Sequence, residues 1–281
     1  MGATFVKRSF ERSEPGPRSR GAPTAAPTRF VLLSTQRSGT SWVMERIARH
    51  ERVGGYGEVL LRGVAGWSNW PPGAADRPFF TTYLSEASAS DSFLPRHLRL
   101  VGYLDYLYEP RRDYEAIGFK LMYDQLRHYP ELLIYLRVNR VRVLHLLREN
   151  LLDIVLSREA MHARQYVHAR SPAERETVRV RVDTRHLLRH LARLDSERRC
   201  VQLLLRALGV QVHELTYESL LADDAGLADA LAFLGIDAAE PSDLSAVMLK
   251  LAPWSHRAGI ENYDDVLSVL TGTRFRRFLR T

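Results

Sequence analysis

The chain of 281 residues contains one cysteine and has no long apolar runs. A single thiol, Cys200, excludes an intrachain disulfide framework and a cysteine-rich zinc site. No apolar run approaches the roughly 20 residues that a membrane-spanning helix needs, so we expect no integral membrane segment. The N-terminus also lacks the apolar stretch of a secretion signal. Together these absences favour the cytoplasm, a reducing compartment.

Positive charge is in excess, with 40 Lys and Arg against 33 Asp and Glu and a formal net charge of +7. This excess suits an anionic ligand. The arginines are spread along the chain and are not gathered with aromatic residues into one stripe, so we expect no nucleic acid partner.

Residues 1–28 are rich in Pro, Gly, Ser and Arg and offer little apolar surface, which predicts a disordered N-terminal arm before a single domain at 29–281. Within the domain, the apolar run at 30–34 predicts a buried strand, and further strands are expected at 116–123, 141–147 and 210–215. Amphipathic stretches predict helices directly after residue 40 and over about 124–136, 150–165 and 184–208. Strands that alternate with helices indicate an α/β domain with a central parallel sheet flanked by helices. Residues 51–116, rich in Gly, Pro, Trp and Tyr, are expected to be an insert that shapes a pocket.

The stretch "TQRSGTSW" at 35–42 lies between the first strand and its helix. Such a loop presents unpaired backbone N–H groups at the positive end of the helix dipole. Gly39 allows close backbone approach, Arg37 adds charge, and hydroxyl groups come from Ser38, Thr40 and Ser41. The pattern predicts a site for a phosphate-like anion, and the alternative is a loop that only caps the helix.

A nucleoside triphosphate loop is the obvious competitor. It needs a glycine at its start and Gly-Lys-Ser/Thr at its end. Here Thr40 follows Gly39 where the lysine would stand, and residues 30–36 contain no glycine. An ATP-magnesium site also needs a carboxylate at the end of another strand, where this chain has Arg148. A kinase-like P-loop enzyme therefore stays as the alternative.

"TQRSGTSW" resembles the 5′-phosphosulfate loop of sulfotransferases that use 3′-phosphoadenosine-5′-phosphosulfate (PAPS). Members of that family have a basic residue before Ser-Gly-Thr-Ser/Thr-Trp, and this chain fills every position from Arg37 to Trp42. The resemblance implies a P-loop-like architecture, PAPS as sulfuryl donor, 3′,5′-bisphosphoadenosine (PAP) as product, and no metal. It implies donor contacts from Arg37, Ser38, Gly39, Thr40, Ser41 and Trp42, with Trp42 near the adenine.

The segment "HLLRENLLDIVLSREA" supplies Arg148 and Ser157, the pair that in this family binds the 3′-phosphate. Arginine offers a forked, charged contact and serine a directed hydroxyl. The two residues lie nine positions apart, one more than in many family members. Taken alone, Arg148 could equally form a structural ion pair with Glu149 or Asp153.

Two later segments are similar to the family in the expected order. "ELTYESLLAD" implies that Tyr217 faces the adenine, and core packing is the alternative for this ring. "HRAGIENYDDV" implies that Arg257 and Gly259 close over the 3′-phosphate, and it resembles the bacterial nodulation-type and carbohydrate branch.

Sulfuryl transfer needs a base for the acceptor proton and cations near the leaving phosphate. The glycine-rich "GGYGEVLL" favours Glu58 as the base, with Arg37 and Lys120 as catalytic cations, Lys120 at a strand end. The alternatives are a solvated turn carboxylate, a surface lysine on an edge strand and a histidine base. His97 and His128 remain open, whereas His145 lies in mid-strand and is expected to be buried and hydrogen-bonded.

The implied acceptor is a hydroxyl or amine of a small molecule, glycan or glycolipid, and a catalytically inactive nucleotide-binding relative is a further alternative. Residues 59–115 are expected to line the acceptor pocket. Its candidate stacking residues are Trp67, Trp70, Phe79, Phe80, Tyr103 and Tyr106, with core packing as the other interpretation of each.

Overall fold

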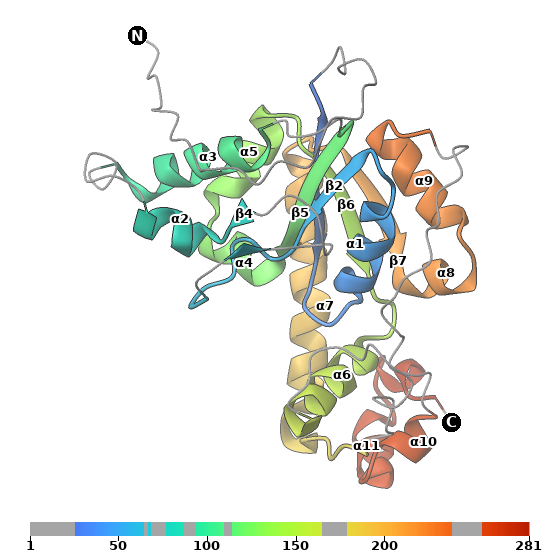
Figure 1. Ribbon diagram of the computed structural model, residues 1–281. Coiled ribbons are helices and arrows are strands. Elements are labelled where there is room, and N and C mark those ends of the chain that lie inside the picture. Colours follow the sequence, from blue (N-terminus) through green and yellow to red (C-terminus); the bar gives the residue numbers. More distant parts are fainter. Residues whose placement is uncertain are drawn as a thin grey trace.

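The computed structural model describes residues 26–64, 67–68, 77–86, 94–109, 114–164, 179–237 and 255–280. A five-stranded sheet with the order β2–β5–β1–β6–β7 forms its centre, and every neighbouring pair of strands is parallel (Figure 1). The strands are β1 (Thr28–Ser34), β2 (Val53–Tyr56), β5 (Ala116–Met122), β6 (Arg142–Leu147) and β7 (Val212–Thr216). The predicted α/β class with a central parallel sheet is confirmed.

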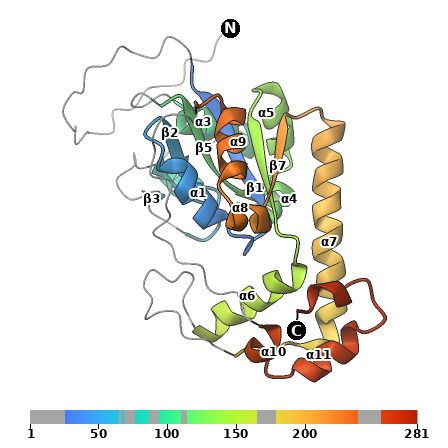
Figure 2. The same ribbon diagram turned by 90° about the vertical axis from the view of Figure 1, so that its right-hand side faces the viewer.

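Both faces of β1 are buried, which explains its continuous apolar run. Val31 and Leu33 pack against one layer, which contains α3 (Arg96–Leu107), α4 (Tyr123–His128), α5 (Glu131–Val138) and the last turns of α7 (Thr184–Ala207). Phe30 and Leu32 pack against the other layer, formed by α1 (Thr40–Ala48), α8 (Tyr217–Ala222) and α9 (Ala225–Leu234). Figure 2 shows α1, α8 and α9 on the same side of the sheet. The remaining elements of the first layer are α2 (Phe80–Glu86) and the short strands β3 (Trp67–Ser68) and β4 (Arg77–Pro78).

A helical lobe lies beyond the carboxyl ends of the strands (Figures 1 and 2). It consists of α6 (Leu151–Arg164), the first turns of α7, α10 (His256–Gly259), α11 (Tyr263–Leu270) and a 3₁₀ turn at Arg276–Phe278. Their apolar side chains form a core separate from the two sheet layers. The lobe therefore faces the edge of the sheet where open parallel sheets bind ligands.

The assignment of 51–116 as an insert outside the sheet is wrong for Val53–Tyr56, which forms β2 and pairs with β5. Its two central glycines weaken any strand pattern, and packing requires them. A Cβ at Gly54 would lie 2.8 Å from the Tyr114 ring, and a Cβ at Gly55 would lie 2.8 Å from the Ala48 Cβ. Because β2 covers β5, the latter is an interior strand.

The single helix expected over about 124–136 is also wrong. The chain forms α4 and α5 instead, with Tyr129 and Pro130 between them. Proline has no N–H to continue the ladder of the first helix, and its fixed φ suits the start of the second. No helix in the described ranges is long and apolar enough to cross a membrane.

Candidate anion-binding and catalytic site

The loop between β1 and α1 makes a tight turn around Gly39. Gly39 has φ +89° at the N-cap of α1, and Arg37 also has a positive φ, +68°. A Cβ at Gly39 would lie 2.4 Å from Cε2 of Tyr217, so the loop backbone packs directly against that ring. The first residue of α8 thus fixes the conformation of the loop.

We expect Gly39→Ala to destabilise the fold by about 2–4 kcal/mol, because left-handed backbone strain and overpacking against Tyr217 add together. Gly63→Ala is the matched control, since Gly63 also has a positive φ, +72°, but a Cβ there meets no atom within 4 Å. Urea unfolding of both variants measures the difference. Equal losses would show that the Tyr217 contact does not constrain the loop.

The side chain of Arg37 joins the loop to the helical lobe. Its Nε donates to Ser157 Oγ at 3.1 Å, and its carbonyl oxygen accepts from Nη1 of Arg148 at 3.0 Å. Arg37, Arg148 and Ser157, which are far apart in the sequence, therefore meet at the carboxyl edge of the sheet. Burial lowers the pKa of Arg37, and the charges of Arg148 and Arg158 lower it further. The charge of the Glu58 carboxylate opposes this shift.

Two buried polar atoms at this edge have no hydrogen-bond partner within the described part of the chain. They are Oγ of Ser38 and Nε of Arg148. A buried polar group without a partner costs about 1–3 kcal/mol. An anionic ligand seated between the loop and Arg148 would provide hydrogen-bond acceptors for both atoms. The residues present therefore fit an anionic ligand.

Tyr217 and Trp42 form an aromatic corner beside these cations. Their rings are 5.8 Å apart in an edge-to-face arrangement, and the guanidinium of Arg148 lies 5.0 Å from the Tyr217 ring centroid. Both side chains are half-buried. Burial raises the pKa of the Tyr217 hydroxyl, which therefore stays protonated at neutral pH. The corner offers an apolar wall next to the anion site.

Lys120 and Glu58 lie on the other side of the loop. Nζ of Lys120 donates to Ser41 Oγ at 2.9 Å and lies 3.6 Å from Oε1 of Glu58. Lys120 is buried because β5 is interior, whereas the Glu58 side chain is 25% exposed. Burial lowers the pKa of Lys120; the Glu58 carboxylate opposes this shift and Arg37 adds to it. A lysine, a carboxylate and a hydroxyl thus converge at the start of α1.

Asp153 on α6 forms the ion pair with Arg148 that the sequence left open, and it also contacts His256 of the C-terminal segment, a link with no local signal in the sequence. Its carboxylate lies 3.3 Å from Nη2 of Arg148 and 2.8 Å from Nε2 of His256. Nδ1 of His256 accepts from the Arg280 backbone N–H at 2.9 Å, so Nε2 carries the proton donated to Asp153. Burial raises the pKa of Asp153, but the His256 hydrogen bond and the Arg148 and Arg280 charges outweigh it and hold the pKa below its usual value.

We expect Asp153→Asn to destabilise the protein by about 1–3 kcal/mol at pH 7. A depressed folded-state pKa stabilises the fold above the ordinary carboxyl value and stops doing so as pH falls through the folded pKa. The difference from the parent should therefore shrink from neutral pH toward about pH 3. Urea unfolding at both pH values tests this, with Asp265→Asn on the exposed side of α11 as the control. A constant difference would exclude the ionised carboxylate as its cause.

Two predicted residues belong to α10. Arg257 is exposed there, with its guanidinium 5.5 Å from the Tyr263 ring centroid. The Gly259 carbonyl accepts from Val180 N–H at 2.9 Å, a structural contact. Sequence reasoning overlooked Arg158, whose charge lowers the pKa of Arg37. Its position directly after Ser157 was the signal that could have identified it.

The histidines differ in their surroundings. His145 is fully buried, 2.6 Å from the Tyr123 hydroxyl and 3.3 Å from Oε1 of Glu214, and burial lowers its pKa. His97 is exposed on α3. His128, at the end of α4, lies next to a cavity described below.

Two of the six predicted stacking residues are core. Phe80 and Tyr103 are buried in the layer around α3, and Tyr106 stacks on Tyr83. Phe79 is half-buried beside α2. Trp70 and the side chain of Trp67 fall outside the described residues. Across the described ranges, no group of three or more His, Cys, Asp or Glu is placed to hold a metal ion.

Comparison with solved structures gives a likeness of fold. The chain is similar to the crystal structure of a sulfotransferase from Alicyclobacillus acidocaldarius, with a TM-score of 0.45 and 15% sequence identity over 90% of this chain and 93% of that one. No protein-family profile matches the sequence, and no curated protein matches it.

Proposed function

We propose that the protein is a PAPS-dependent sulfotransferase that transfers the sulfuryl group to an acceptor hydroxyl or amine. One observation carries the proposal: Arg37 contacts both Ser157 and Arg148, so the 5′-phosphosulfate loop and the 3′-phosphate pair of the sequence resemblance meet at one edge of the sheet. The unpartnered Ser38 and Arg148 atoms and the nearby charge of Arg158 support the same assignment.

In this proposal Arg37 and the loop N–H groups hold the 5′-phosphosulfate, with hydroxyls from Ser38, Thr40 and Ser41. Arg148 and Ser157 hold the 3′-phosphate, and the corner of Trp42 and Tyr217 receives the adenine. Gly39 keeps the backbone close to the ligand. The preference for PAP over AMP then comes from the charged contact of Arg148. The same proposal assigns Arg257 and Gly259 to the segment that closes over the 3′-phosphate.

The donor supplies an activated sulfuryl group. The acceptor oxygen forms a bond to sulfur, the bond between sulfur and the 5′-phosphate oxygen breaks, and that oxygen keeps the electron pair. Glu58 accepts the acceptor proton, and its Oε1 lies 3.6 Å from Nζ of Lys120, beside the transferring group. Lys120 and Arg37 stabilise charge on the transferring group and the leaving phosphate. No metal has a role in this scheme.

The direct test is transfer of ³⁵S from labelled PAPS to an organic acceptor by the full chain. Label in an organic sulfate ester, with PAP formed in equal amount, is the expected result. Phosphoryl transfer from ATP with magnesium and none from PAPS would instead identify the kinase-like alternative. PAP binding without transfer to any acceptor would identify an inactive relative.

A further inference from the structure

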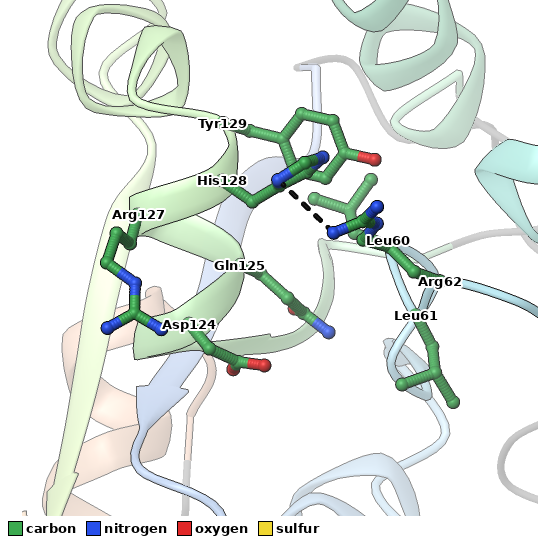
Figure 3. A pocket seen from close by; sticks show the side chains of 8 residues that line it. All are labelled: Leu60, Leu61, Arg62, Asp124, Gln125, Arg127, His128 and Tyr129. Atoms are coloured by element: carbon green, nitrogen blue, oxygen red, sulfur yellow. Dashed lines mark hydrogen bonds between the residues drawn. The ribbon is translucent and has the colours of Figure 1, made fainter.

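A cavity of about 390 Å³ lies between α4 and the turn that follows Glu58 (Figure 3). Its lining consists of Leu60, Leu61, Arg62, Asp124, Gln125, Arg127, His128 and Tyr129. The volume falls within the usual range for small-molecule sites. Leu60, Leu61 and Arg62 belong to the stretch expected to line the acceptor pocket, whereas the α4 wall, apart from His128, was not among the candidates.

The two walls of the cavity belong to the segments that carry Glu58 and Lys120. On one wall, the Leu61 N–H donates to the Glu58 carbonyl at 2.8 Å, which places both residues in one tight turn. The other wall is α4, which begins at Tyr123 directly after β5, the strand of Lys120. The Lys120 N–H donates to the Gly57 carbonyl at 3.2 Å and ties the two walls together.

Gln125 supplies an unused donor in this cavity. Its side chain is 5% exposed, and its Oε1 accepts from the Met122 N–H at 3.1 Å. Its Nε2 is buried and has no hydrogen-bond partner in the part of the chain that the structure describes. Figure 3 shows the amide extending from α4 toward the Leu61 wall. A buried donor left without an acceptor is costly, so its orientation points to a ligand oxygen.

The other polar groups of the lining complete a mixed set of donors and acceptors. The Asp124 carboxylate extends in the same direction as Gln125, and Arg62 faces it from the opposite wall beside His128, with Nη1 3.5 Å from Nδ1 (Figure 3). Arg127 points away and pairs with Glu197 at 3.6 Å. Carboxylate, amide and guanidinium together match a ligand whose groups both donate and accept, as hydroxyls do.

A flat aromatic acceptor fits this lining poorly. The only aromatic ring of the lining apart from His128 is Tyr129, which is 5% exposed. Its ring is already in contact with Phe80, Arg96 and His128, at 5.9, 5.1 and 4.5 Å. The lining therefore has no free tyrosine face for stacking.

We infer that this cavity binds the acceptor and that the acceptor is a polyol of the sugar type, read by Gln125, Asp124 and Arg62. Its role as the acceptor site rests on the proposed sulfotransferase function. In this arrangement one sugar hydroxyl extends past Leu60 and Leu61 toward Glu58 in the same turn, while its neighbours bond to the three polar side chains.

The test measures sugar binding and donor binding separately. Saturation-transfer NMR with methyl glucoside, galactoside and mannoside, and with maltose and lactose, reports binding to the full chain in the presence of PAP. Gln125→Glu keeps the oxygen that accepts from Met122 and replaces only the free amide nitrogen, and Arg62→Met removes the opposing donor. Arg189→Met, on an exposed part of α7, is the matched control.

At least one of these sugars should bind, and each cavity variant should weaken that binding about tenfold, as expected for a lost hydrogen bond to a charged or buried group. The control should stay within about twofold of the parent. Absence of sugar binding, equal binding by all variants, or displacement of the sugar by p-nitrophenol with tighter binding of the phenol would overturn the inference. PAP affinity, measured by calorimetry in the same samples, decides the proposed function separately. Without PAP binding, the acceptor role of the cavity fails as well, even if sugars bind.

Discussion

Glu58→Gln should lower kcat for sulfuryl transfer by about 10²–10⁴-fold, the usual contribution of a general base. Glutamine has nearly the same shape and cannot accept the acceptor proton. The nucleotide contacts assigned to the loop, Arg148 and Ser157 do not involve this carboxylate, so PAP affinity should stay within about twofold. Turnover with labelled PAPS and calorimetry with PAP measure the two quantities.

Glu115→Gln is the matched control for this substitution. Glu115 precedes β5 at the opposite end from Lys120 and pairs with Arg52 at 2.9 Å. The substitution therefore removes a carboxylate and an ion pair from the same sheet and leaves the residues of the proposed site unchanged. Undiminished kcat in Glu58→Gln would exclude Glu58 as the base and reopen the choice of a histidine.

The second large effect is expected for Arg148→Ala, which should weaken PAP binding by about 1.5–3 kcal/mol, the usual value for a lost charged hydrogen bond. This corresponds to roughly ten- to 150-fold in Kd. AMP, which lacks the 3′-phosphate, should lose less. The AMP affinity should nevertheless fall to some extent, because Arg148 also supports the loop by donating to the Arg37 carbonyl.

Arg280→Ala separates the direct contact from the Asp153 network. Arg280 lies 3.6 Å from the same carboxylate, and its backbone N–H, which donates to His256, survives the substitution. PAP affinity of this variant should match the parent. Equal losses for PAP and AMP in Arg148→Ala would contradict its assignment to the 3′-phosphate.

The sheet strands with continuous apolar runs could be predicted because burial on both faces leaves a local signature. β1, β5 and β6 follow that rule, whereas β7 is an edge strand whose residues are mostly half-buried. β2 does not, because its glycines are required by the Tyr114 ring and the Ala48 methyl, neighbours that only the folded chain brings close. Because β2 was not predicted, the burial of Lys120 could not be decided from the sequence. A lysine on an edge strand is exposed to solvent, whereas Lys120 on the interior strand β5 is buried.

The first loop could be predicted in detail because its residues are consecutive and each has a local purpose. The partners of Arg148 could not. Asp153 was visible as one possible ion-pair partner, but its contact with His256 spans 103 positions, and the histidine tautomer depends on a backbone donor at Arg280. The cavity beside Glu58 is likewise assembled from two segments whose polar residues look like ordinary surface residues.

Calorimetric titration of the full chain with PAP, with AMP, and with ATP and magnesium tests the central claim most directly. We expect tight binding of PAP without metal, much weaker binding of AMP, and no preference for ATP with magnesium. Equal affinity for PAP and AMP, or binding of ATP with magnesium alone, would contradict the sulfotransferase proposal and would mean that the loop at Arg37 holds a different anion.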